Sequence, residues 1–434
     1  MNRADDLRAI FDAGLEAVQP AAVLPPHLPE PPKGRLIVLS CGKAAGRFAQ
    51  TAEAHYLDRL GLDPKRLEGI AVARTGYGCP TRRIEMVEAG HPLPDEAGLR
   101  ATLRTLVLAE SAGRDDLVLC LVSGGGSANW VAPVKGVGLE DKRAVSDVLL
   151  KASVPIGRLN AVRKHLSRIK GGRLQQAIHP APSLTLAISD VPGDDPEVIA
   201  SGPTVADPTT LAEARAIAAA FRDRLPASVL AALEDAGNET LKPGAPALAR
   251  AAYRLIARPA DMIAAAARKA EALGYRALVL GVDLEGEARS VARIHAKEAL
   301  AHARNREKVA LISGGELTVT VTGDGEGGPN QEYATALAIA LAGSTGISAL
   351  AADSDGTDGG SSLADDPAGG LVDGQTLQKA ARAGVDAQAA LAANDSRRFL
   401  QAAGALFTPG PTGTNANDLR VICVDTAGAI PDKT

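Results

Sequence analysis

The chain is poor in aromatic side chains and in cysteine. Phe, Tyr and Trp together make up 3% of its 434 residues. The core is therefore expected to be aliphatic and rich in alanine. The four cysteines are Cys41, Cys79, Cys120 and Cys423. Because none belongs to a C-x-x-C pair, we expect neither a zinc site nor a disulfide framework, and we predict a reducing, cytoplasmic location.

The chain also lacks an excess of charge and long apolar runs. Its net charge is −4, with no long basic run, which argues against nucleic-acid and membrane-surface partners. No stretch approaches the length of a membrane span, and the first 20 residues predict an amphipathic helix in place of a signal peptide. A length of 434 residues predicts two domains. The polar stretch 237–247 is the expected boundary, giving domains 1–240 and 241–434.

The stretch that organises the chain is LVLCLVSGGGSA, residues 117–128. Its unbroken apolar run, 117–122, predicts a strand buried on both faces of a parallel sheet. The glycines that follow allow backbone N–H groups to converge on an anion, and ligands of open α/β sheets bind beyond the carboxyl ends of strands. We therefore predict an anion site here, with a plain tight turn as the alternative. Its candidate residues are Ser123, Gly124, Gly125, Gly126 and Ser127.

Basic residues recur near this kind of turn. Lys43 follows a predicted strand, 35–40, and precedes a helix, where its charge can meet a phosphate group. A second helix is predicted from Arg158, with an apolar stripe at spacings of three and four. Its other faces carry Arg163, Lys164, Arg168 and Lys170 as far as the glycine pair 171–172. A solvated loop lysine and a solvated basic face are the alternatives.

Carboxylates follow two other predicted strands. Asp190 lies at the tip of the strand 183–188. Asp353, Asp355 and Asp358 follow the strand 348–352. Carboxylates at strand tips can hold a divalent cation or its bound waters, whereas a solvated acidic turn is the alternative. Together these residue types suit phosphoryl transfer, which depends on positioning and on neutralising charge.

Eight runs in register resemble the glycerate 2-kinase family. They are SCGKAAG, GHPLPDE, LVSGGGSA, NAVRKHLSRIKGGRL, ISDVPGDD with IASGPT, ISGGELTVTV, DSDGTDG and GPTGTNANDL. The resemblance implies an α/β fold: a large, doubly wound, Rossmann-like amino-terminal domain joined to a smaller α/β domain called MOFRL, here about 307–425. It also implies an active site in the cleft between the domains.

The resemblance further implies a function. The expected reaction is ATP-dependent phosphorylation of D-glycerate at its 2-hydroxyl, giving 2-phosphoglycerate and ADP with Mg²⁺. The oligomeric state is left open, with a homodimer as the candidate. The predicted catalytic residues are Lys43, Arg163, Lys170 and Asp190. The predicted nucleotide- and phosphate-binding residues are those of the glycine loop together with Gly314, Gly315, Glu316, Asn330 and Gln331. The predicted substrate-binding residues are Lys43, Asn129, Arg163, Lys164 and Asn415. The predicted metal ligands are Asp190, Asp353, Asp355 and Asp358.

The sequence departs from the family at one position. Pro329 stands where many members carry an arginine proposed to assist catalysis. If that charge is needed, Arg163, Lys164 or Lys170 must supply it; otherwise the enzyme is slow or acts on another substrate. Two other functions compete. An NAD(P)H-dependent hydroxypyruvate reductase needs a dinucleotide fingerprint, which the turns after Cys41 and Ser123 lack. A non-catalytic regulator would keep only the anion cradle.

Overall fold

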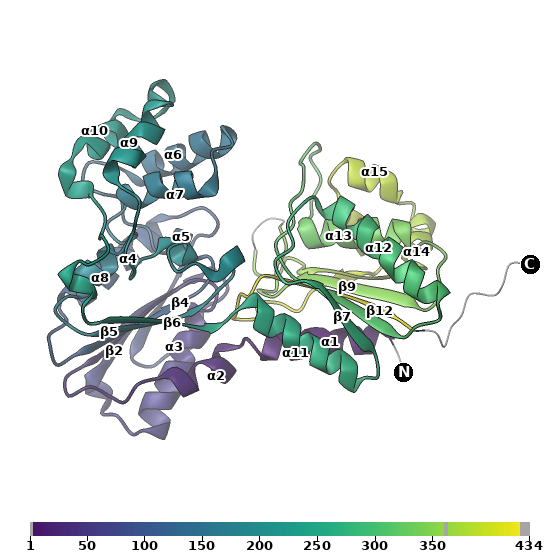
Figure 1. The fold of residues 1–434 in the computed structure, drawn as a ribbon, viewed down its shortest axis with the longest axis horizontal. Coiled ribbons are helices and arrows are strands. Elements are labelled where there is room, and N and C mark those ends of the chain that lie inside the picture. Colours follow the sequence, from purple (N-terminus) through teal and green to yellow (C-terminus); the bar gives the residue numbers. More distant parts are fainter. Residues whose placement is uncertain (1–2, 360–362, 426–434) are drawn as a thin grey trace, which may run out of the picture. The chain divides into compact units, whose positions relative to one another are not determined.

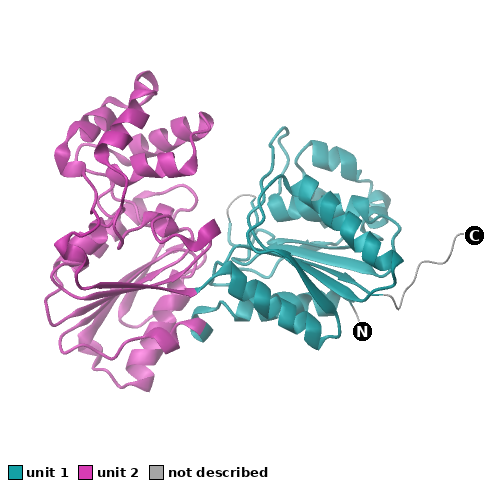
Figure 2. Ribbon diagram, in the orientation of Figure 1, with its two compact units in different colours: residues 1–22, 257–434 teal, residues 23–256 magenta. Residues whose placement is uncertain are grey.

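The chain folds into two compact α/β units, each built around a six-stranded sheet (Figures 1 and 2). The computed structural model describes residues 3–359 and 363–425. Unit 1 comprises residues 1–22 and 257–434, and unit 2 comprises residues 23–256. None of the helices within the described ranges is long and apolar enough to cross a membrane.

Unit 2 contains a doubly wound sheet. Its strands are β1 (Leu36–Cys41), β2 (Leu67–Arg74), β3 (Ile84–Ala89), β4 (Leu117–Val122), β5 (Ser183–Ile188) and β6 (Ala251–Ala257). Their spatial order is β3-β2-β1-β4-β5-β6, and β1 to β5 pair in parallel. This is the Rossmann order, in which the chain winds outward in both directions from the gap between β1 and β4. The predicted fold class is confirmed.

Helices cover both faces of this sheet. They are α3 (Ala45–Glu53), α4 (Glu96–Glu110) and α8 (Arg173–Ile178), with the short α5 (Gly126–Asn129) after β4. Unit 2 also contains α6 (Leu139–Lys151), α7 (Ile156–His165), α9 (Leu211–Ala219) and α10 (Ala227–Glu234), and α2 (Pro20–Val23) lies where the chain passes from unit 1 to unit 2. Figure 1 shows α3 on one face, and α4 and α8 on the other. The helices α6, α7, α9 and α10 pack around a separate apolar cluster that includes Val145, Leu159 and Val229.

Unit 1 is a mixed sheet between helices. Its strands are β7 (Arg276–Gly281), β8 (Val309–Ser313), β9 (Ile347–Asp353), β10 (Gly369–Asp373), β11 (Leu406–Phe407) and β12 (Asp418–Val424), in the order β11-β10-β9-β12-β8-β7. Only β7 and β8 pair in parallel. The helices α1 (Arg3–Glu16) and α11 (Pro259–Ala272) lie on one face (Figure 1). The other face carries α12 (Ala288–Arg304), α13 (Pro329–Ala340), α14 (Thr376–Arg382), α15 (Ala387–Ala392) and α16 (Ser396–Ala402).

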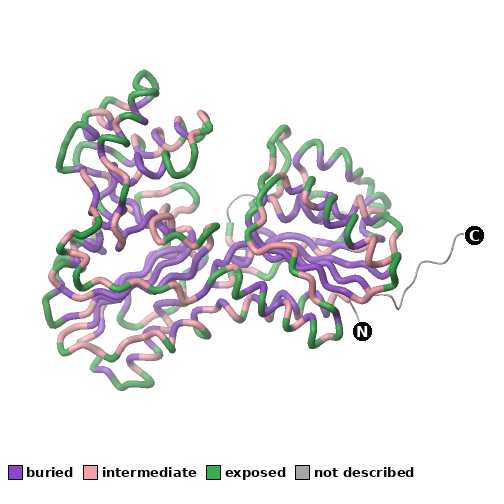
Figure 3. The backbone as a smooth tube through the Cα atoms, viewed as in Figure 1, coloured by how far each residue is buried: buried purple, intermediate pink, exposed green. Residues whose placement is uncertain are grey.

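The cores are aliphatic, as the shortage of aromatic residues predicts. Burial concentrates along the strands of both sheets (Figure 3). The main cluster of unit 1 consists largely of Ala, Val, Leu and Ile, with Tyr333 and Phe399 as its buried aromatic members. Alanine lets helices approach a sheet closely, so close packing replaces large side chains.

The compact units differ from the predicted division after residue 240 in two respects. The chain passes from unit 2 to unit 1 at Ala257, because β6 completes the sheet of unit 2 after the polar stretch 237–247. The first helix, α1, belongs to unit 1. Its Phe11 is 1% exposed and packs edge-on against Phe407 with the ring centroids 5.1 Å apart. Pairing between the two ends of a chain leaves no signal in local sequence.

We predict that Phe11→Ala lowers the free energy of unfolding by about 3–5 kcal/mol, because it leaves a cavity between α1 and the sheet. Urea unfolding of the full chain measures the change. Glu16→Ala, at an exposed position of the same helix, is the control. Equal stability of the two variants would contradict the packing of α1 in the core of unit 1.

Candidate functional site

Two loops of unit 2 are tied together where the doubly wound sheet reverses direction. Strands β1 and β4 are in register, with Cys41 opposite Val122, so both end at the same edge. The N–H of Lys43 donates to the Gly124 carbonyl at 2.8 Å, and the N–H of Ala44 donates to Ser123 Oγ at 3.0 Å. Gly42 has φ of +103°, and a Cβ there would lie 2.5 Å from the Ser123 carbonyl oxygen. The tie therefore requires glycine at this position.

The glycine loop brings Lys43 and His91 together. Gly125 has φ of +82°, and a Cβ there would lie 3.2 Å from both Lys43 Cγ and His91 Nε2. Lys43 therefore lies beside the glycine loop. His91 is a residue that the sequence analysis did not select, although it lies within the GHPLPDE run. Because glycine has no Cβ atom, a ligand can approach the backbone of this loop closely, as in phosphate-binding loops.

Two of the basic residues after Arg158, Lys164 and Lys170, are buried, whereas Arg168 is exposed. Helix α7 ends at His165, whereas the apolar stripe predicted a helix continuing toward Lys170. Extended pairing takes over, because Ser167 forms a bridge with Pro133 and the N–H of Arg168 donates to the Ala132 carbonyl at 2.8 Å. Lys164 and Lys170 are 4% and 0% exposed. The alternative of a solvated basic face is therefore wrong for these two lysines.

Lys170 lies directly beneath the glycine loop. Its Nζ donates to the Ser127 carbonyl at 2.7 Å. Burial, followed by the charges of Arg163 and Lys142, lowers the pKa of Lys170 well below its ordinary value. Lys164 differs, because it pairs with the buried carboxylate of Asp207 at 3.3 Å. The two lysines that the sequence presents alike thus have different surroundings.

Basic side chains gather here without matching carboxylates. Lys142 Nζ donates to the carbonyls of Arg163 and Leu166, both at 3.2 Å, and burial with the nearby Arg163 lowers the pKa of Lys142 to about 7. Arg163 forms no ion pair with any residue of the described ranges, and its Nε is buried without a hydrogen-bond partner. Because an uncompensated buried charge is unfavourable, this group of Lys142, Arg163 and Lys170 favours an anionic ligand.

Strained backbone borders the same edge of the sheet. Asp190 follows β5 closely, as the sequence predicts for a strand-tip carboxylate. Farther along, Ala200 and Ser201 have φ of +49° and +64°, an unusual conformation for residues other than glycine. Ser201 Oγ lies 2.7 Å from Ser127 Oγ, which ties this segment to the glycine loop. Buried Asn129, a predicted substrate residue, donates toward the Gly90 carbonyl and leaves its Oδ1 without a partner.

In unit 1, a buried polar network joins the acidic loop to α13. Asp358 accepts the N–H groups of Asn330 and Gln331 at 3.0 and 2.8 Å, so its carboxylate caps the amino end of α13. The Asn330 side chain donates in turn to Asp418 Oδ1 at 2.7 Å. Asp418 lies beside Asp353 because β12 runs antiparallel to β9. Sequence reasoning missed Asp418, although it stands in the GPTGTNANDL run.

Arg420 connects this network to the predicted Ser-Gly-Gly turn. Its guanidinium donates to the carbonyls of Gly314 and Gly315 at 2.9 and 3.0 Å and pairs with Asp418. The two predicted nucleotide-binding glycines are therefore held by a buried arginine, which is 1% exposed. Glu316, the next residue, is exposed. The side-chain oxygens of Asn330 and Gln331 are buried acceptors without hydrogen-bond partners.

The other predicted carboxylates shape their own loop. Asp353 Oδ1 accepts the N–H of Asp355 at 2.8 Å, and Asp355 Oδ1 accepts the N–H of Thr357 at 2.7 Å. Asn415 likewise accepts the N–H of Asn417. Within residues 3–359 and 363–425 there is no cluster of three or more His, Cys, Asp or Glu side chains suited to a metal ion. Magnesium bound together with nucleotide phosphates needs only one or two carboxylates.

Known proteins share this architecture along most of the chain. Residues 6–234 match the family described as Domain of unknown function (DUF4147), and residues 309–418 match the MOFRL family. A Glycerate 2-kinase of Pyrococcus horikoshii is 39% identical, covering 90% of this chain and 88% of that protein. The crystal structure of a glycerate kinase from Thermotoga maritima is 37% identical, covers 98% of this chain and 100% of its own, and superposes with a TM-score of 0.83.

The chain belongs to the glycerate 2-kinase family. The resemblance drawn from the eight runs is confirmed, and so is the two-domain α/β architecture. A relative from Agrobacterium vitis carries the provisional name hydroxypyruvate reductase and is 45% identical, covering 96% of this chain and 94% of that protein. The glycerate 2-kinase family therefore includes close sequence relatives under both names, and the chemistry of the site has to discriminate between the two activities.

We predict that Asp358 makes stability depend on pH. Burial, followed by the charge of Asp418, raises the pKa of Asp358 from 3.8 to about 7. Because the folded pKa exceeds the unfolded one, its stabilising contribution is complete below about pH 4 and is lost as pH rises through about 7. Asp358→Asn removes this titration. The wild-type advantage over the variant in unfolding free energy should therefore shrink from about pH 4 to about pH 8.

Urea unfolding across that range measures the difference. Asp386→Asn is the matched control, because Asp386 caps the exposed start of α15 by accepting the N–H of Ala389. A difference for Asp358→Asn that stays constant with pH would show that folding does not raise the pKa of Asp358.

Proposed function

We propose that this protein transfers the γ-phosphoryl group of ATP to the 2-hydroxyl of D-glycerate, with Mg²⁺, giving 2-phosphoglycerate and ADP. The observation that carries the proposal is the glycine loop at the β1–β4 reversal, with Lys43 beside it and Lys170 beneath it. Phosphoryl transfer requires such positioned donors, because the enzyme must stabilise charge on the transferred group. The names of the relatives support the substrate.

The surroundings of each residue in unit 2 suggest its role in the proposed reaction. Backbone N–H groups of Gly124, Gly125 and Ser127 are proposed to hold phosphate oxygens. Lys43 supplies a positive charge at the mouth of the loop. Lys170 holds the Ser127 carbonyl in place from below. Bound Mg²⁺ would neutralise phosphate charge, and Asp190 is the proposed carboxylate of unit 2 that holds it.

The proline at position 329 has a structural explanation. Pro329 is the first residue of α13, where proline's fixed φ suits the helix and no backbone hydrogen bond is lost. An arginine side chain is therefore absent where many family members carry one. Among the three candidates to supply the charge, Lys164 is engaged by Asp207 and Lys170 by the Ser127 carbonyl. We therefore assign this role to Arg163, which has no carboxylate partner among the described residues.

The fold supports a hydroxypyruvate reductase less well than a kinase. A dinucleotide-binding unit needs a G-x-G-x-x-G turn that directly joins a strand to a helix. Gly323 to Gly328 have this spacing, but β8 ends at Ser313 and the described residues between there and Pro329 form no further named strand. The turn after β4 reads SGGGSA, which lacks the third glycine. Oxidation of NADH by the protein with hydroxypyruvate tests this second activity directly.

Lys43→Ala is expected to lower kcat/KM for glycerate phosphorylation at least about 100-fold, equivalent to about 2.7 kcal/mol of transition-state stabilisation. A coupled assay of ADP release measures it, with circular dichroism to verify folding. Lys65→Ala, at an exposed lysine of the same unit, is the control and should behave as wild type. Near-normal turnover of a folded Lys43→Ala protein would remove Lys43 from the mechanism.

Asp190→Asn and Asp355→Asn are expected to raise the Mg²⁺ concentration for half-maximal activity about tenfold or more at fixed ATP. The reason is that each change removes a negative charge proposed to lie near the metal. Mg²⁺ titrations of both variants measure this effect, and melting temperatures are recorded alongside. If both variants have lower melting temperatures but keep the wild-type Mg²⁺ midpoint, these aspartates only stabilise their turns and do not bind the metal.

A further inference from the structure

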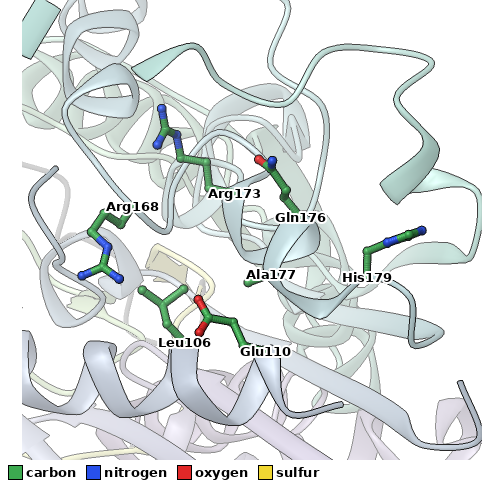
Figure 4. A pocket seen from close by; sticks show the side chains of 7 residues that line it. All are labelled: Leu106, Glu110, Arg168, Arg173, Gln176, Ala177 and His179. Atoms are coloured by element: carbon green, nitrogen blue, oxygen red, sulfur yellow. The ribbon is translucent and has the colours of Figure 1, made fainter. Parts of the chain in front are cut away.

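Unit 2 contains a polar pocket that the proposed phosphorylation site does not use. The pocket has a volume of about 460 Å³ and lies between α4 and the segment leading into α8 (Figure 4). Arg168, Arg173, Gln176 and His179 line it from one side, and Glu110 lines it from α4. Figure 4 shows the side chains of Leu106 and Glu110 facing this basic segment across the pocket.

The pocket is separate from the glycine loop. In a doubly wound sheet the helices run back from the carboxyl ends of the strands to the amino ends. Glu110 is the last residue of α4, shortly before β4 begins at Leu117. His179 likewise follows the end of α8, shortly before β5 begins. These two residues therefore lie toward the sheet edge opposite to the glycine loop, and no lining residue belongs to the predicted catalytic set.

The charge of Arg168 is not neutralised by any residue that lines the pocket. Arg168 is exposed and forms no ion pair with any residue in the described ranges. Arg173 donates to the carbonyls of Gly237 and Glu239 at 3.4 and 3.1 Å, and its Nε is buried without a partner. Glu110 is the one acidic residue of the lining, and it pairs with neither arginine. Glu239 and Asp235 act electrostatically on Arg173, so Arg168 is the guanidinium open to a ligand. A guanidinium binds planar or tetrahedral oxyanions with paired hydrogen bonds.

We propose that this pocket is a second, regulatory site, which binds a small anion carrying phosphate or carboxylate groups and alters the glycine loop when it is filled. Anion binding at this pocket does not depend on the proposed kinase activity, but any effect of the anion on turnover does. Gln176 and His179 add hydrogen-bonding groups, so the ligand is a polar molecule with several oxygens. The volume exceeds that of a bare phosphate ion and admits a small phosphorylated or polycarboxylic acid.

A single segment links the two sites. Arg168 and Arg173 both line the pocket, and between them Lys170 reaches the glycine loop and holds the Ser127 carbonyl at 2.7 Å. Gly171 and Gly172 have φ of +60° and +76°, so the chain reverses direction tightly within this segment. Movement of either arginine toward an anion is therefore transmitted to the backbone that positions Lys170. The coupling passes through contacts within unit 2.

The chain carries its own reporter for this coupling. Trp130 is the sole tryptophan of the sequence. It is 1% exposed and follows α5, and its backbone N–H donates to the Gly126 carbonyl at 2.9 Å. The next residue, Val131, donates its N–H to Thr102 Oγ1 of α4 at 2.9 Å. Tryptophan emission thus reports on the junction between the glycine loop and α4.

Calorimetric titration of the full chain with inorganic phosphate, and separately with citrate, tests binding at constant ionic strength, with NaCl as the reference. The wild type should show a binding event that Lys43→Ala retains, and Arg168→Ala and Gln176→Glu should weaken that event at least about tenfold. Any phosphate bound at the glycine loop is weakened by Lys43→Ala instead. Arg100→Ala, at an exposed position of α4 outside the lining, should match the wild type. Phosphate-only or citrate-only binding identifies which of the two oxyanions the pocket takes.

Trp130 emission during the same titrations tests the coupling. The wild type should show a saturable change with the calorimetric midpoint, and Lys170→Met should keep binding but lose most of that change. Two results would overturn the site: no binding of either anion to the wild type, or binding that survives Arg168→Ala and disappears in Lys43→Ala. Binding without any change in emission would overturn the coupling. Neither assay measures turnover, so both can be interpreted even if the protein has no kinase activity.

Discussion

The tie between the β1 and β4 turns is the constraint on which the site of unit 2 depends. Two N–H groups after β1, those of Lys43 and Ala44, are held by the Gly124 carbonyl and Ser123 Oγ after β4. Because the chain winds away from this gap in both directions, no helix crosses it and a ligand can reach the backbone. Close approach is possible only without side chains, since a Cβ at Gly126 would lie 2.7 Å from Cys41 Sγ.

Buried charge is the second theme, and its sign differs between the units. Unit 2 buries Lys142 and Lys170 near the half-buried Arg163, with backbone carbonyls as the partners of both ammonium groups. Unit 1 buries Asp358 and Asp418, and burial raises the pKa of Asp418 to about 6 despite the neighbouring Arg420. Burying such groups opposes folding. Their presence in a family of kinases is consistent with sites that position charge for a highly charged substrate.

Much of the fold follows from local sequence, and the site follows in part. The apolar runs before Gly42 and Ser123 predict buried parallel strands, and the glycines after them predict the loops that the structure shows. The apolar stripe from Leu159 to Ile169 predicts a longer helix than α7. The periodicity of apolar residues carries no information on the pairing of Ser167 with Pro133, which ends the helix. His91 and Asp418 were missed as site residues, because a lone histidine or aspartate carries no pattern. Both stand in runs that resemble the family, which is the signal that leads to them.

The sequence by itself determined the two-domain α/β class, the glycine loops and the family, because these depend on local runs of residues and on their order. Tertiary structure alone decided which basic residues are buried. Lys164 and Lys170 look alike in sequence, yet one meets Asp207 and the other the Ser127 carbonyl. It also decided that α1 joins unit 1 and that Asp358 caps α13. Each of these contacts joins residues far apart in the chain, and their energy depends on packing that no local pattern encodes.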